Sequence, residues 1–333
     1  MTLPAGLARI LPMLATLALL VAAISLVSPG FLDISVANGR LYGSPIDVLN
    51  RGAPVALLAI GMTLVIATGG IDLSVGAVMA ICGAVAAKMV TLGYPLPLTL
   101  LAALATGAAC GLWNGLLVSV LRIQPIIATL ILMVAGRGIA QLVTEGAILT
   151  FSDPGFAFLG SGAILSVPFP VLLWTAAAVG TILVLRRTAL GFLIEAVGVN
   201  ARAAYRAGVN TRATIIAVYV VSGLCAALAG LVVTADIRGA DANNAGLWLE
   251  LDAILAVVIG GNSLLGGRFS IVASLIGAMI TQTVNTGILL AGFPPEYNLL
   301  IKAWIVLVIL LVQSPRLRPL LARRRASRQG TPT

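Results

Sequence analysis

The sequence predicts an all-α polytopic membrane protein with about ten transmembrane helices, some of them short or broken, and with both termini in the cytoplasm. Of its 333 residues, 60% are hydrophobic and only 9% are charged, and the mean hydropathy of the whole chain is +1.10. Soluble proteins carry roughly 25% charged residues, so this composition is typical of a chain that lies in lipid over most of its length. Because all loops are short, we expect a single transmembrane domain over residues 1–333.

The expected helices correspond to apolar runs. A span takes about 20 residues, so the second run is short and the eighth is far too short to cross alone. The first run follows Arg9 as a signal peptide would, but it lacks a clear small-residue cleavage site, and we interpret it as a retained helix. The runs cover approximately residues 10–28, 53–68, 72–90, 97–121, 125–144, 168–185, 213–235, 251–261, 268–290 and 299–314.

The orientation follows from arginine and lysine, which concentrate in cytoplasmic loops. With both termini inside, most of the 20 basic residues are cytoplasmic, which explains the net charge of +9 by topology and anionic lipid, without nucleic acid. Residues 186–213 then form the longest cytoplasmic loop, and residues 315–333 form a basic cytoplasmic tail that we expect to be disordered. The external basic residues are Arg40, Arg51, Lys88, Arg238 and Lys302, and the external acidic ones are Asp33, Asp47, Glu145, Asp153, Asp236, Asp241, Glu250, Asp252 and Glu296.

The composition also argues against an enzyme. The chain has no histidine, and Cys82, Cys110 and Cys225 are isolated, so we expect no catalytic triad, no metal site and no bound cofactor. The two lysines, Lys88 and Lys302, do not belong to a phosphate-binding G-K-[ST] loop. If the protein uses ATP, another chain binds it.

A glycine motif occurs twice in the sequence. GGIDLSVG at 69–76 matches GGNSLLGG at 260–267 with a constant offset, and each copy follows a short apolar run and precedes a long one. This pattern predicts a helix that breaks at the paired glycines and restarts at a side-chain cap, and repeated interrupted helices indicate the substrate route of a transporter. The residues that we assign to this route from the motif are Gly69, Gly70, Asp72, Ser74, Gly260, Gly261 and Ser263.

Several polar residues inside apolar runs have two interpretations each. Asp72 either caps the helix that starts at Leu73 or lines the pathway and binds a polar substrate, and the two roles are compatible. Arg137 lies roughly 18 Å into its span, at 1.5 Å per residue, and either reaches outward to the membrane surface or faces a wet cavity. Polar helix residues most often bond between helices, but as a set they would suit a hydroxyl-rich solute: Asn114, Gln141, Gln282 and Asn285.

The cytoplasmic loop contains the stretch EAVGVNARAAYRAGVN at 195–210. Asn200 can cap a short helix, and Gly208 can end it. In that helix, Ala201, Ala204 and Tyr205 are expected on one face, and Arg202 and Arg206, four residues apart, on another. A two-turn helix is unstable alone in water, so it must dock, either on the bilayer or on a cytoplasmic partner.

The stretches TGGIDLSVGA and EAVGVNARAAYRAGVN resemble the two signature stretches of ribose-type sugar ABC importer permeases, and the similarity covers nearly the whole chain. Within that family, the chain most resembles the permeases of galactofuranose importers. The resemblance implies that Gly69–Ser74 lies near the translocation route and that Glu195–Asn210, here termed the coupling segment, inserts into a cleft of an ATPase subunit. The residues carried over for coupling are Glu195, Gly198, Asn200, Arg202, Ala203, Ala204, Arg206, Gly208 and Asn210.

The resemblance also implies the partners and the location. It implies a multi-pass subunit of the bacterial inner membrane, paired with a second, distinct permease, a cytoplasmic ATPase that binds ATP and Mg²⁺, and a periplasmic sugar-binding protein. We expect the binding protein to dock over residues 145–167 and 237–252. The alternative is an ion-coupled secondary transporter with broken helices; it explains the repeat equally well, but it needs a titratable residue at mid-depth, for which only Asp72 qualifies, and it leaves the coupling segment unexplained. A channel has little support.

Overall fold

The longest helix, α10 (Thr211–Asp236), is the central element of the fold in a computed structural model that describes residues 5–37, 39–292 and 297–313. It packs against α3 (Ala53–Ala67), α4 (Val75–Thr91) and α5 (Leu96–Ser119). Glycines allow this close approach, because a methyl group on Gly107 or Gly223 would overlap the facing backbone. The predicted basic tail at 315–333 lies outside the described residues.

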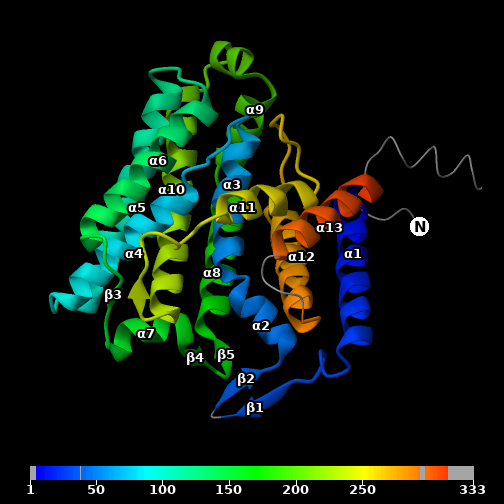
Figure 1. The fold of residues 1–333 in the computed structure, drawn as a ribbon. Helices are drawn as coiled ribbons and strands as arrows, with labels where there is room; N and C mark the ends of the chain where they lie inside the picture. The colour runs from blue at the N-terminus through cyan, green and yellow to red at the C-terminus, as the bar shows by residue number, and fades with distance from the viewer. Residues whose placement is uncertain (1–4, 38, 293–296, 314–333) are drawn as a thin grey trace, which may run out of the picture.

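The other helices surround this centre (Figure 1). Helix α11 crosses in front of α3, and α1 lies beside α12 at the edge of the bundle. Their bounds are α1 Ala5–Val27, α2 Ser44–Arg51, α6 Pro125–Thr144, α7 Pro154–Ser161, α8 Phe169–Arg187, α9 Leu190–Arg206, α11 Leu249–Ile259, α12 Ile271–Leu290 and α13 Asn298–Gln313.

Every predicted apolar run contains a helix, but the predicted number of spans is not confirmed. Among the described residues, six helices are long and apolar enough to cross a membrane, or seven if α2 and α3, bent by 45° at their junction, form one span. Helices α11 and α13 have only 11 and 16 residues, and a crossing takes about 20. The cytoplasmic position of both termini stays a prediction.

Burial separates the inner helices from the outer ones. All residues of α3 are buried except Pro54, whereas in α8 only Pro170 and Ala178 are buried. A helix that is apolar on all sides belongs in the interior of the bundle, as α3 does, whereas the apolar, exposed surface of α8 suits lipid. The first break motif therefore lies at the end of an interior helix.

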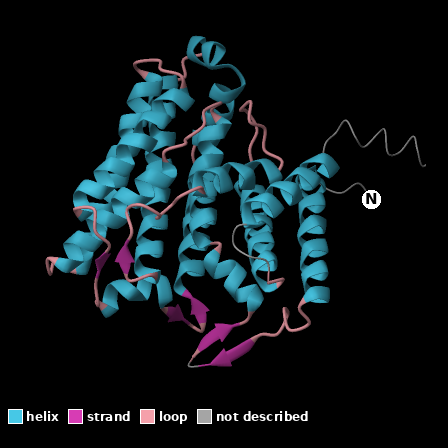
Figure 2. Cartoon of the chain, in the orientation of Figure 1, coloured by secondary structure: helices cyan, strands magenta, loops and turns pink. Residues whose placement is uncertain are grey.

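Three small antiparallel sheets, which the all-α prediction did not include, lie toward the end of the bundle opposite α9 (Figures 1 and 2). One of them joins β3 and β6 and thereby ties residues 145–167 to residues 237–252, the two loops expected to receive the binding protein. The strands are β1 Ser35–Ala37, β2 Arg40–Tyr42, β3 Leu149–Thr150, β4 Ala163–Ile164, β5 Val167–Pro168 and β6 Gly239–Ala240.

Candidate functional site

The first helix break, residues 68–74, separates α3 from α4. Gly69 has a φ of +79°, and its N–H donates to the Ile66 carbonyl oxygen at 2.9 Å. The Gly70 N–H donates to the Val65 carbonyl oxygen at 3.1 Å. Together these two bonds form a Schellman motif, a helix end whose left-handed residue, here Gly69, is usually glycine. The predicted end of a helix at the paired glycines is therefore confirmed here.

Asp72 holds this break in place through hydroxyl groups. Its Oδ1 accepts the Ser74 N–H at 3.1 Å and the Ser74 hydroxyl at 2.6 Å, and its Oδ2 accepts the Ser222 hydroxyl of α10 at 2.8 Å. The Asn114 side chain of α5 donates to Ser74 Oγ at 2.8 Å. The Asp72 cluster (Asp72, Ser74, Asn114 and Ser222) thus links three helices, and each member is at most 1% exposed.

The structure corrects the predicted cap at Asp72. Helix α4 starts at Val75 and not at Leu73, and Ser74 stands in the cap position, so Asp72 precedes the helix. The carboxylate therefore forms a local turn and a contact between helices, as Asp side chains do when they compete with regular helix geometry. Its role in binding a solute stays a prediction, because the carboxylate is enclosed in this conformation.

Two further polar atoms lie near the Asp72 cluster. Asn114 Oδ1 and Tyr219 Oη are buried and have no hydrogen-bond partner among the described residues. Tyr219 Oη is also close to the first break, because a methyl group on Gly70 would stand 2.8 Å from it. Ser222 and Tyr219 both lie on α10, and no motif in the sequence marks either of them.

The second break, residues 260–270, separates α11 from α12. The Gly261 N–H donates to Val258 at 2.8 Å, the Asn262 N–H donates to Val257 at 3.2 Å, and Gly261 has a φ of +70°. Gly261 therefore has the same position in the second break that Gly69 has in the first. The sequence match pairs Gly69 with Gly260, so the structural repeat is shifted by one residue relative to that match.

Ser263 does not cap a helix, contrary to the prediction. It is exposed, and its hydroxyl accepts only the Leu265 N–H at 3.2 Å. Ser270 caps α12 instead, because Ser270 Oγ accepts the Ala273 N–H at 3.3 Å. The second break is thus longer than the first, and Asn262 closes it by accepting the Ser270 N–H at 2.8 Å.

The coupling segment belongs to a kinked helix whose second half begins and ends where the sequence predicts. Asn200 leaves the helical conformation at φ −160° and ψ 96°, and its Oδ1 accepts the Ala203 N–H at 3.0 Å. Gly208, at φ +90°, ends the second half, and the Val209 N–H donates to the Ala204 carbonyl oxygen at 3.0 Å. The predicted cap and stop are confirmed, and the preceding half from Leu190 was not predicted as helix.

The kinked helix has one packed face and one free face. Ile194, Val197 and Ala204 are buried, whereas Tyr205 is 70% exposed, so the expected common face of Ala204 and Tyr205 is wrong. Consecutive helix residues point about 100° apart, which separates these two side chains. The side chains of Arg202, Ala203 and Arg206 are exposed as well, while Asn210 caps α10 by accepting the Ala213 N–H at 3.1 Å.

The two breaks and the coupling segment meet at Gly198. The Gly267 N–H donates to the Ala67 carbonyl oxygen at 2.9 Å. A methyl group on Gly198 would overlap that same carbonyl oxygen, and one on Gly266 would stand 3.0 Å from the Gly198 carbonyl oxygen. The three segments are therefore in direct backbone contact, and only glycine fits at Gly198.

Arg137 occupies a separate site on the other side of α4. Its guanidinium donates to the carbonyl oxygens of Ala242 and Ala245, so it holds the loop before α11. Whether Arg137 reaches the membrane surface or faces a wet cavity stays a prediction. Gln141, one turn further along α6, donates to Asn243 Oδ1 at 2.6 Å. Both of these residues therefore contact the 241–248 loop.

Two acidic residues expected on the outer face are buried. Glu250 and Asp252 are 8% and 7% exposed in the first turn of α11, where negative charge is favourable. In the loop itself, Asp241 is bonded by the Asn244 side chain at 2.7 Å, which holds the pKa of that carboxyl below its usual range.

The predicted pathway residues thus fall into separate groups. Asp72, Ser74 and Asn114 form one cluster, and Arg137 with Gln141 forms another. Gly260, Gly261 and Ser263 belong to the second break, while Asn285 lies half-buried within α12. The structure does not bring them together around one cavity.

An apolar helical bundle with two helix breaks that contact a partly exposed kinked helix has the features of a transporter subunit. Residues 44–310 match the family model described as the branched-chain amino acid transport system permease component, and the chain belongs to this family.

Curated relatives agree with this assignment. The chain is 62% identical to the galactofuranose transporter permease protein YtfT of Escherichia coli (strain K12), over 92% of this chain and 90% of that protein. It is 41% identical to the fructose import permease protein FruF of Bifidobacterium longum (strain NCC 2705), over 87% and 83% of the two chains. It is 39% identical to the ribose import permease protein RbsC of Escherichia coli (strain K12), over 91% and 93%. The resemblance to sugar importer permeases seen in the sequence motifs is therefore confirmed.

Proposed function

We propose that this chain is the membrane-spanning permease subunit of an ATP-binding-cassette importer and that it passes a monosaccharide, galactofuranose, from the periplasm to the cytoplasm of a bacterium. The 62% identity to a galactofuranose permease over 92% of the chain supports the choice of sugar, and the ribose and fructose permeases are more distant.

The close backbone contact between Gly198 and the two helix breaks is the main support for the proposed coupling between the ATPase and the helix bundle. The free face of α9, with Tyr205 and Val199 70% and 75% exposed, offers a surface for the ATPase. A push on that face reaches the Ala67 carbonyl oxygen and the Gly267 N–H directly through Gly198. Movement of the coupling segment therefore shifts the ends of α3 and the second break together, which is how a packed bundle changes between two arrangements.

The outer face would receive a sugar-loaded binding protein. The β3–β6 pair makes one surface from the two loops that we assigned to docking. Arg137 of α6 bonds two carbonyl oxygens of the 241–248 loop. A binding protein that displaces this loop would therefore also displace α6. A second, distinct permease would complete the pathway, and ATP with Mg²⁺ would bind only to the ATPase.

The alternative, an ion-coupled secondary transporter, depends on Asp72. Its carboxylate is 1% exposed, and both of its oxygens accept serine hydroxyls. A proton or sodium carrier needs that group to open to water on each side in turn, whereas an ABC permease can use it as a fixed link between helices. The exposed coupling segment has no role in the alternative.

Reconstitution tests the proposal. The chain is placed in proteoliposomes with the proposed second permease, ATPase and binding protein, and ATP hydrolysis is measured with a panel of pentoses and hexoses in both ring forms. We expect galactofuranose to stimulate hydrolysis and uptake more than ribose or fructose. Uptake by this chain alone, abolished by an uncoupler, would establish the alternative.

A further inference from the structure

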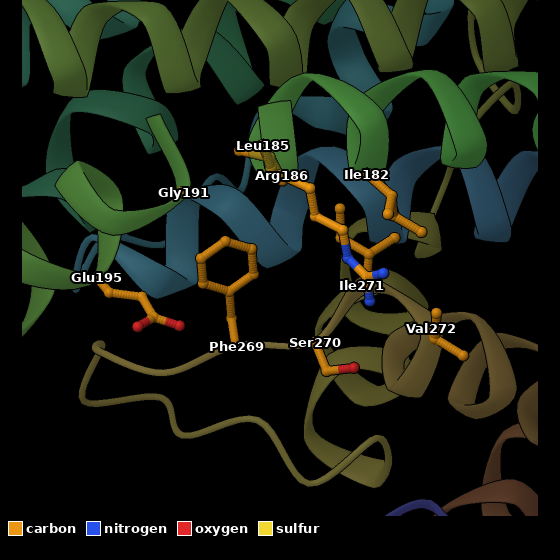
Figure 3. Close-up of a pocket in the computed structure, with 9 residues that line it drawn as sticks. All are labelled: Ile182, Leu185, Arg186, Gly191, Glu195, Phe269, Ser270, Ile271 and Val272. Carbon is orange, nitrogen blue, oxygen red and sulfur yellow. The ribbon is translucent and has the colours of Figure 1, made fainter. Parts of the chain in front are cut away.

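A hollow of about 270 Å³ lies at the end of α8, between α9 and the start of α12 (Figure 3). Its wall is apolar over most of its length, from Ile182 and Leu185 of α8 and from Phe269 and Ile271 near the start of α12. Arg186 and Glu195 also line it, and Figure 3 shows them at opposite ends with Phe269 between them. The hollow therefore offers one positive and one negative group above an apolar wall.

Both charged side chains are available for a ligand. Neither Arg186 nor Glu195 makes a side-chain hydrogen bond or an ion pair within the described part of the chain. Arg186 is exposed and follows the long apolar run of α8, so the hollow lies where that helix leaves the membrane interior. A ligand at this depth meets lipid on one side and water on the other.

We propose that this hollow binds a lipid whose headgroup carries both charges, a phosphate linked to a primary ammonium as in phosphatidylethanolamine. The Arg186 guanidinium matches phosphate oxygens with its planar set of N–H donors, and the Glu195 carboxylate accepts from the ammonium. The apolar wall covers the carbons next to the headgroup. A lipid with only a negative headgroup would pair with Arg186 but would leave Glu195 without a cation.

A second hollow lies on the other side of the last turn of α8. It also measures about 270 Å³, is lined almost entirely by apolar side chains, and shares Leu185 with the first hollow. The last turn of α8 therefore has an unfilled groove on each side, one with charges and one without. A lipid bound here would touch α8 and the first half of α9 at once.

Lipid binding to the full chain tests this inference without a transport assay. Native mass spectrometry of the detergent-purified protein would compare phosphatidylethanolamine with phosphatidylglycerol on the wild type and on Arg186→Gln. Arg187→Gln is the matched control, because Arg187 is the next residue, has the same charge and does not line the hollow. We expect Arg186→Gln to weaken phosphatidylethanolamine binding about tenfold, since a charge-assisted pair is lost, and Arg187→Gln to leave it within about twofold.

A second variant separates a zwitterionic site from an anionic one. Glu195→Gln removes the partner of the ammonium only, so it should weaken phosphatidylethanolamine binding and leave phosphatidylglycerol binding equal or stronger. Equal losses from Arg186→Gln and Arg187→Gln would reduce the effect to general surface charge and overturn the proposal. An unchanged ratio of the two lipids in Glu195→Gln would also overturn it, in favour of an anionic lipid site. Unchanged thermal unfolding of each variant in detergent excludes misfolding as the cause.

Discussion

The Gly267 N–H donates to the carbonyl oxygen of Ala67 at 2.9 Å, and this bond joins the two helix breaks directly. Gly198 of the coupling segment lies against the same carbonyl oxygen. A backbone contact transmits displacement better than a contact between long side chains, because neither side can rotate away. The breaks and the coupling segment should therefore move as one unit.

Replacing Gly198 with alanine should uncouple transport. The added methyl group would overlap the Ala67 carbonyl oxygen and the Gly267 backbone nitrogen, so α9 must separate from both breaks. We expect sugar uptake and sugar-stimulated ATP hydrolysis to fall at least about tenfold, while basal hydrolysis by the assembled complex continues. Both rates are measured in proteoliposomes.

Gly180→Ala is the matched control for this variant. Gly180 lies in α8, and a methyl group there meets nothing within 4 Å, so the same substitution should leave both rates unchanged. Full sugar-stimulated hydrolysis in Gly198→Ala would show that α9 acts on the bundle by some other route.

The Ser222 hydroxyl should contribute to stability through Asp72. Ser222→Ala removes one of the donors to a carboxyl group that is 1% exposed, and leaving a buried acceptor without its donor costs about 1–3 kcal/mol. We expect the midpoint of thermal unfolding in detergent to fall by several degrees. Ser119→Ala provides the comparison, since the Ser119 hydroxyl is buried and has no hydrogen-bond partner among the described residues.

The comparison of the two serines makes this prediction specific. Ser119→Ala removes a polar atom that has no bond to lose, so its midpoint should stay the same or rise. If both variants lose the same stability, the Asp72 cluster contributes no more than ordinary packing.

Local patterns in the sequence predicted much of this structure correctly. The apolar runs predicted the long helices, and Asn200 and Gly208 fix the ends of the short coupling helix because caps and stops depend on residues within one turn. The family also followed from two short motifs. These features all depend on neighbours in the chain.

The contacts of the candidate site could not be predicted in the same way. Ser222 is 150 positions from Asp72, and nothing local marks it as the partner of that carboxylate. Arg137 bonds backbone carbonyl oxygens, which leave no signature in the sequence. Residue identity alone pairs Gly69 with Gly260 in the repeat. The hydrogen bonds instead make Gly261 the equivalent of Gly69, one residue further along.

Arg137 should fix the loop that precedes α11. Arg137→Gln loses the bonds to Ala242 and Ala245, so hydrogen exchange of the amides in 241–248 should become faster, by roughly the tenfold or more that a loss of 1.5–3 kcal/mol implies. Exchange is followed by mass spectrometry on the detergent-purified chain. Gln141→Ala removes only the exposed bond to Asn243 and should change the exchange much less. Equal exchange in Arg137→Gln and the wild type would mean that the loop is held by other contacts.

The free face of α9 should bind the ATPase mainly through Tyr205 and Arg206. Both side chains are exposed, and a partly apolar, positively charged helix face fits a cleft with an acidic rim. We expect the double variant Tyr205→Ala and Arg206→Glu to weaken retention of the ATPase about tenfold or more in co-purification from membranes. Arg122→Glu makes the same charge change in the loop after α5, on the side of the membrane predicted to be cytoplasmic, and should retain the ATPase. If the ATPase stays bound to the double variant at wild-type levels, its docking surface lies elsewhere, and the exposed aromatic ring of Tyr205 needs another explanation, such as contact with lipid headgroups.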